Sequence, residues 1–168
     1  ERKCLPEIIQ AAKIVVDEFP KVKFLIAGRV GDGYEFAQNL IRVNGLTESV
    51  FLLGEVSLDD KIEYFRSCAI YLQPSKYEGF GVAIAEAMAC GAPVISTDVG
   101  EVSTVVGDAG ILMANSDPEG IAHNVIDMLN NPDLRGSLGL AGRSRIVEFF
   151  GVEVRQNYFR RILSDFSK

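Results

Sequence analysis

Residues 74–95 read PSKYEGFGVAIAEAMACGAPVI, and one charged side chain interrupts an otherwise apolar helix within them. From Val82 to Cys90 every residue is small or apolar except Glu86. No Lys or Arg lies three or four positions away to form a local ion pair with it. An unpaired carboxylate in apolar surroundings costs several kcal/mol or is neutralised. Glu86 therefore needs a partner, which is either a distant residue or a ligand.

The turn before this helix has the features of a phosphate site. Gly79-Phe80-Gly81 predicts a tight turn leading into a helix that begins at Val82. Free backbone N–H groups and the positive end of the helix dipole suit a diphosphate at that point. Glu78 precedes the turn, and Glu86 follows about one turn into the helix. An ionised carboxylate accepts two hydroxyl donors, so two adjacent sugar hydroxyls, such as those of a ribose, match it.

Short apolar strands and amphipathic helices alternate along the rest of the sequence. The strands are predicted at 22–27, 50–53, 69–72, 93–96 and 111–113. The helices are predicted at 5–19, 34–43, from 57, at 82–90, at 117–129, from 131 and at 152–166. This order predicts an α/β fold, a doubly wound, mostly parallel Rossmann-like sheet with helices on both faces. Such sheets bind ligands beyond the carboxyl ends of their strands.

Length and composition narrow the function classes. The 168 residues make one domain, and the hydrophobic share of 48% is ample for a single core. The net charge of −6 argues against a nucleic-acid partner and gives no basic patch for a membrane surface. Three widely spaced cysteines predict neither a disulfide framework nor a zinc site.

The ends of the sequence suggest that it is part of a longer protein. It starts without Met, and no strand precedes the first predicted helix, although doubly wound domains normally open with one. Residues 1–168 are therefore expected to be a domain fragment that lacks its first strand.

A second glycine-rich stretch is a weaker candidate for a nucleotide site. Residues 28–33 have the order G-x-x-G-x-G, and the dinucleotide fingerprint is G-x-G-x-x-G. No acid at the end of the next strand completes that fingerprint. We interpret the stretch as a plain turn into a helix.

The pattern P-S-x-x-E-G-F-G-x-x-x-x-E-A-M-A-x-G-x-P-V-I resembles the C-terminal donor-binding domain of family-four retaining glycosyltransferases of the GT-B architecture. Their hallmark is two glutamates eight positions apart, matched here by Glu78 and Glu86. The segment 50–56 (VFLLGEV) is similar to the family's strand and base-contacting loop, and 109–143 to its closing strand and helices.

The resemblance implies a role for each matching residue. Glu86 would hold the ribose, and Glu78, as the catalytic residue, would contact hydroxyls of the transferred sugar. The remaining donor-binding residues implied are Gly79, Phe80, Gly81 and Val82 at the diphosphate, Lys3 as its cation, and Val56 at the base. A second cation of the family, an Arg, would lie upstream of Glu1.

The same resemblance implies transfer of a hexose from a nucleoside diphosphate sugar to an acceptor with retention, without cofactor or metal. It implies an N-terminal acceptor domain in the same protein, no catalysis by the fragment alone, and a cytoplasmic location. Any association with the inner face of a membrane would come through the rest of the protein.

The sequence departs from the family pattern at two places. Cys4 stands where relatives usually have Gly, and residues 100–104 read GEVST where they usually read G-G-x-P-E. Two alternatives stay open, and the second change motivates the first of them. One is a binding module that kept the fold and lost turnover, and the other is a different GT-B enzyme, such as a nucleotide-sugar epimerase.

Overall fold

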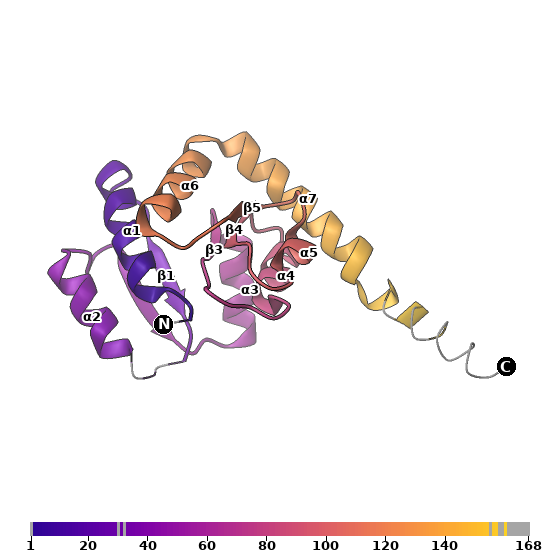
Figure 1. Cartoon of the computed structure of the whole chain (residues 1–168), viewed down its shortest axis with the longest axis horizontal. Helices are drawn as coiled ribbons and strands as arrows, with labels where there is room; N and C mark the ends of the chain where they lie inside the picture. The colour runs from indigo at the N-terminus through magenta and orange to yellow at the C-terminus, as the bar shows by residue number, and fades with distance from the viewer. Residues whose placement is uncertain (1, 30, 32, 155, 158–159, 161–168) are drawn as a thin grey trace.

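The computed structural model describes residues 2–29, 31, 33–154, 156–157 and 160 (Figure 1). Its strands are β1 (Phe24–Ala27), β2 (Val50–Gly54), β3 (Tyr71–Gln73), β4 (Val94–Thr97) and β5 (Ile111–Met113). Its helices are α1 (Leu5–Glu18), α2 (Tyr34–Val43), α3 (Leu58–Ser67), α4 (Val82–Ala89), α5 (Val102–Val106), α6 (Pro118–Asn130) and α7 (Pro132–Phe150).

All strand pairs are parallel, which confirms the predicted α/β class. β1 pairs with β2, and β4 lies between β3 and β5. The strand predicted at 22–27 is shorter and begins at Phe24, and the one predicted at 69–72 lies at Tyr71–Gln73. Within the described residues β1 and β3 are not paired with each other, so the sheet is in two parts.

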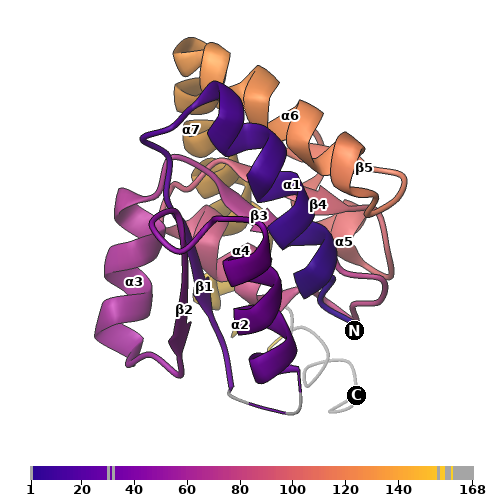
Figure 2. The same ribbon diagram turned by 90° about the vertical axis from the view of Figure 1, so that its left-hand side faces the viewer.

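Helices cover both faces of the strands. Residues of α1 and α2 form a core with β1 and β2, and α1 packs along α6, as Figure 2 shows. Helices α3, α4 and α5 form a second core with the end of α7. A third core lies between the strands and helices α1 and α6. Neighbouring residues of β4 point to opposite faces of the sheet, because Val94 belongs to the second core and Ile95 to the third.

One helix was not predicted, and another predicted helix is described only in part. Helix α5 was not predicted, because its sequence VSTVV is rich in β-branched residues, which helices disfavour slightly. Burial of Val102, Val105 and Val106 explains why it forms. Helix α7 ends at Phe150, and a helix was predicted at 152–166. Its described residues, 152–154, 156–157 and 160, are helical as predicted, and the rest of the range lies outside the described residues.

The predicted helix starts at 57, 117 and 131 are confirmed. The side chains of Ser57, Asp117 and Asn131 each accept a hydrogen bond from a backbone N–H three residues later. Such caps pair N–H groups that have no partner inside the helix.

We expect Asp117→Ala to lower the free energy of unfolding by about 1 kcal/mol, because it removes the cap of α6. The lost bond joins the Asp117 carboxylate to the Gly120 N–H at 2.7 Å. Urea unfolding would measure the change, with Glu119→Gln as the control, since Glu119 lies in the same turn without capping it. Equal losses from the two variants would contradict a capping role.

Candidate functional site

The predicted diphosphate turn lies beyond the carboxyl end of β3. Gly81 adopts a φ of 80° and is followed directly by α4, so the first N–H groups of that helix have no partner within it. Gly79, Phe80 and Val82 are exposed, whereas Gly81 is buried. An anion can therefore approach the backbone at this point.

The neighbouring strand and loop hold this turn in place. The Ser96 hydroxyl donates to the Gln73 carbonyl at 2.8 Å, and the Thr97 hydroxyl donates to the Ser75 carbonyl. The Glu101 N–H donates to the Gly79 carbonyl at 2.9 Å. The loop that departs from the family pattern thus contacts the backbone of the turn itself.

Glu78 is buried, with 7% of its surface exposed, and its carboxylate pairs with the ammonium of Lys3. Burial alone would raise the pKa of Glu78. Hydrogen bonds from Lys3 and Ser75, together with the charges of Lys3 and Arg2, outweigh burial and lower that pKa below its ordinary value. The structure therefore brings together two residues that the sequence assigned to the sugar and to the diphosphate.

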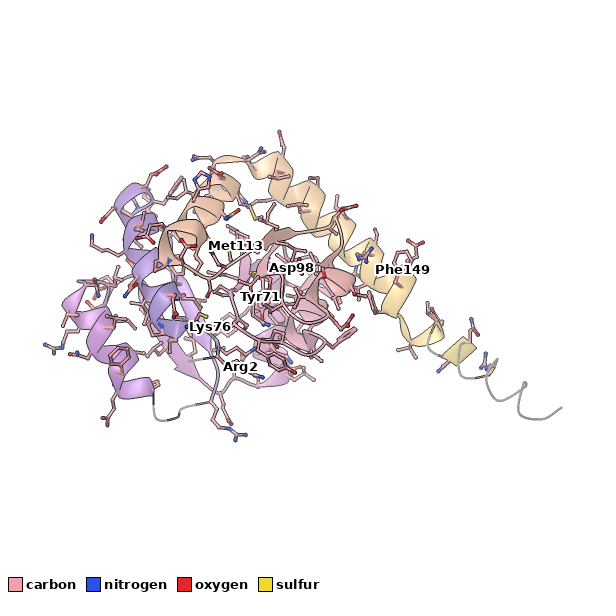
Figure 3. All side chains as sticks on the ribbon, in the orientation of Figure 1. Arg2, Tyr71, Lys76, Asp98, Met113 and Phe149 are labelled. Carbon is pink, nitrogen blue, oxygen red and sulfur yellow. The ribbon has the colours of Figure 1, made fainter. Side chains whose placement is uncertain are left out.

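The segment before α1 is anchored beside the turn by further contacts. The Lys76 N–H donates to the Arg2 carbonyl at 2.9 Å, and the Lys76 ammonium lies 2.8 Å from the carboxylate of Glu7. Figure 3 shows Arg2 and Lys76 close together, on the side of the molecule away from Phe149. Lys3 is therefore held at the site by its own segment.

Cys4, where the family usually has Gly, begins α1 with a φ of 55°. It is the only non-glycine residue with a positive φ within the described part of the protein. Glycine is favoured in this conformation because it lacks a Cβ, which accounts for the usual residue at this position.

We expect the Lys3–Glu78 pair to stabilise the protein only while Glu78 is ionised. Its pKa is lowered by folding, so the contribution is complete above the unfolded value, near 4.5, and is lost as the pH falls through the folded value. The difference in unfolding free energy between wild type and Glu78→Gln should therefore shrink as the pH falls below 4.5. Urea unfolding at a series of pH values would measure it, and a constant difference would contradict the pairing.

Glu86 has a distant partner, which answers the question its sequence raised. The Lys61 ammonium, on α3, lies 3.0 Å from each oxygen of the Glu86 carboxylate. The sequence did not predict Lys61 as this partner, because nothing in helical spacing links residues that lie 25 positions apart. Val56, the predicted base contact, lies half-buried on the connection between β2 and α3.

A polar pair on β3, made by half-buried Tyr71 and buried Gln73, was also not predicted. The Tyr71 hydroxyl donates to the Gln73 side-chain oxygen at 2.5 Å, and both residues belong to β3. Burial, and then the charges of Glu78 and Glu86, raise the pKa of Tyr71. Tyr71 therefore stays protonated and donates its hydrogen bond at neutral pH.

An open groove of about 610 Å³ runs beside Glu86, between α4 and the end of α7. Apart from Glu86 its lining is apolar: Phe80, Val82, Ala85, Ala89, Ile146, Phe149, Phe150 and Val154. The rings of Phe80 and Phe150 meet edge to face at 5.5 Å, so the diphosphate turn is in contact with α7.

The glycine-rich stretch at 28–33 begins beside the end of β2, where the Gly28 N–H donates to the Gly54 carbonyl at 2.8 Å. In its described part, Arg29 pairs with Glu55 at 3.1 Å, and both side chains are exposed. Val30 and Asp32 lie outside the described residues.

Comparison with known proteins finds a matching family. The family model "Glycosyl transferases group 1" matches residues 1–145. N-acetyl-alpha-D-glucosaminyl L-malate synthase of Bacillus anthracis is 33% identical over 97% of this chain and 42% of its own length. The chain spans about two-fifths of the length of the first curated relatives it matches.

Two solved structures share the fold. S. aureus TarM, crystallised with fondaparinux, alpha-GlcNAc-glycerol and UDP, gives a TM-score of 0.84 and 25% identity over 95% of this chain and 33% of its own. The C-terminal domain of the glycosyl transferase group 1 protein LpcC from Francisella tularensis gives 0.80 and 23% over 90% of this chain and 81% of its own. These matches confirm the predicted GT-B type of α/β fold.

Among the residues with a described position, no three His, Cys, Asp or Glu side chains gather as metal ligands would. No helix in the same part of the protein has the length and apolar character needed to cross a bilayer.

Proposed function

Because the chain belongs to the group 1 glycosyl transferases, we propose that it is the donor-binding domain of a family-four enzyme that transfers a hexose with retention. The donor is a nucleoside diphosphate sugar. The observation that carries this proposal is the short span from Glu78 to Glu86, in which two carboxylates flank the exposed start of α4.

Each part of this span has a separate task in the proposed site. The N–H groups at Phe80, Gly81 and Val82 hold the diphosphate, and the positive end of α4 offsets its charge. Glu86 accepts hydrogen bonds from the ribose, and Glu78 accepts them from the sugar that is transferred. Lys3 lies next to Glu78, so a donor in this site would place one phosphate within reach of its ammonium.

Retention follows from a front-face transfer in which the leaving diphosphate assists. Leaving-group charge is then met by Lys3 and by the start of α4, in place of a metal ion. Transfer in the presence of EDTA would test this part of the proposal, and loss of activity that only a divalent cation restores would overturn it.

The sheet itself supports the proposal that a strand precedes residue 1. Among the described residues β1 and β3 are not paired with each other, and the usual Rossmann order places the first strand between these two. Leu25 and Phe51, paired across β1 and β2, are 51% and 38% exposed, although parallel strands are normally covered on both faces. We place the acceptor domain upstream of this strand, so that residues 1–168 form the C-terminal part of the enzyme.

Titrating the full-length protein with UDP-, GDP- and ADP-sugars tests donor binding and identifies the base. We expect micromolar to millimolar binding of one class, and weakening of about 1.5–3 kcal/mol on Glu86→Ala, the range for hydrogen bonds to a charged group. Binding of none of the three classes, or unchanged affinity in Glu86→Ala, would overturn the assignment.

Product analysis with the bound donor separates the remaining functions. Transfer with retained configuration supports the proposal, whereas an isomerised nucleotide sugar would identify an epimerase. Binding without transfer or hydrolysis would identify a module that kept the fold and lost turnover. Residues 1–168 alone are expected to bind at least about tenfold more weakly and to catalyse no transfer, because one domain covers only one wall of the cleft.

A further inference from the structure

The contact between Lys61 and Glu86 joins two helices at the proposed ribose site. Lys61 lies in the first turn of α3, and its ammonium is 3.0 Å from both carboxylate oxygens of Glu86 in α4. The two side chains are 33% and 39% exposed. Among the described residues the carboxylate of Glu86 has no other hydrogen-bond or ion-pair partner.

The position of Lys61 is unusual for a cation. The start of a helix carries partial positive charge, so acidic residues are favoured there and Lys is not. Asp59 and Asp60 follow that preference in the same turn of α3. An exposed ion pair contributes little to stability, so bracing α3 against α4 is a weak reason for a Lys at this position.

The contact geometry between Lys61 and Glu86 gives a stronger reason for a Lys at this position. Lys61 approaches both oxygens of Glu86 from α3, and Glu86 also lines the groove between α4 and α7. A carboxylate oxygen can accept more than one hydrogen bond, so the two oxygens keep acceptor capacity beyond the bonds to Lys61. A free Glu side chain samples several rotamers, and fixing one in advance favours a ligand that needs both oxygens.

We propose that Lys61 is a positioning residue that orients the Glu86 carboxylate to accept hydrogen bonds from both ribose hydroxyls of the donor. This inference rests on the proposed role of Glu86 in donor binding. Lys61 itself touches the carboxylate and not the ribose, so its effect depends on the presence of the two hydroxyls and of Glu86.

The test compares nucleotides with and without those hydroxyls. Calorimetry on the full-length protein would use UDP and GDP, each beside its 2′,3′-dideoxy counterpart, with the unfolding free energy measured in parallel. The preference is the affinity for the ribose form divided by the affinity for the dideoxy form. For the nucleotide that binds, Lys61→Met should reduce this preference about tenfold and change the affinity for the dideoxy form less than twofold. Lys61→Arg, which keeps a cation with several donors, should restore most of the preference.

Two further variants make the result specific. Lys13→Met removes the exposed Lys13–Asp17 pair of α1 and should leave the preference unchanged. Glu86→Gln should lose the preference, and adding Lys61→Met to it should cause no further loss.

Four results would overturn the proposal. If Lys61→Met weakened binding of the ribose and dideoxy forms equally, Lys61 would act by attracting the phosphates. If it weakened binding of neither form, Lys61 would play no part in nucleotide binding. A Lys61→Met effect that persists in Glu86→Gln would show that Lys61 acts independently of Glu86. A wild-type protein that binds both forms equally would instead overturn the ribose role of Glu86, and the positioning role with it.

Discussion

Gly100→Ala is expected to lower the free energy of unfolding by about 3 kcal/mol and to weaken nucleotide binding, because the new methyl group collides with the diphosphate turn. A Cβ built at Gly100 would lie 1.9 Å from the Glu78 carbonyl oxygen and 2.9 Å from that of Gly79. Gly100 also has a φ of 59°, which non-glycine residues rarely adopt. Both atoms in the collision are backbone, so the turn itself must move.

Gly45→Ala is the matched control for this variant. Gly45 follows α2 with a φ of 67°, but a Cβ there would meet nothing within 4 Å. It should therefore cost only the backbone strain, about 1 kcal/mol, and leave nucleotide binding unchanged. Urea unfolding and calorimetry would measure both quantities. If both variants lose the same stability and both bind nucleotide normally, the loop does not support the turn.

Glu78→Gln is expected to reduce turnover of the full-length protein about 100-fold and to change nucleoside diphosphate affinity less than threefold. Gln keeps the size of the side chain but loses the charge that would act on the transferred sugar. In the proposed site the nucleotide is held mainly by the start of α4 and by Glu86, so its affinity should persist. Steady-state rates with the donor and calorimetry with the nucleoside diphosphate would measure the two effects.

Glu7→Gln is the matched control, because Glu7, in the first turn of α1, also pairs its carboxylate with a Lys. We expect its turnover to stay within about threefold of wild type, because Glu7 lies in α1 and pairs with Lys76 instead of Lys3. Wild-type turnover in Glu78→Gln would show that transfer of the sugar does not depend on this carboxylate. Equal losses in both variants would indicate that the whole segment has shifted.

Local patterns sufficed for most elements of the fold. The caps at Ser57, Asp117 and Asn131 act within three residues, so their sequence signals predicted the helix starts correctly. The turn Gly79–Gly81 and the helix after it were predicted for the same reason, since glycine and helix period act over short distances. The alternation of strands and helices then predicted the parallel sheet.

The partners of the two glutamates depended on the tertiary structure. Lys3 and Glu78 lie 75 positions apart, and Lys61 and Glu86 lie 25 apart, so no local period connects them. Helix α5 shows the same limit, because burial of its valines outweighs their weak helix preference.

The sequence by itself therefore determined where the turn, the helix and the two carboxylates of the site occur, since each depends on neighbours in the sequence. Only the tertiary structure decided which cation each carboxylate meets and that Gly100 lies against the turn. Those contacts depend on how parallel strands bring distant loops to one edge of the sheet, and no spacing within a single segment encodes that packing.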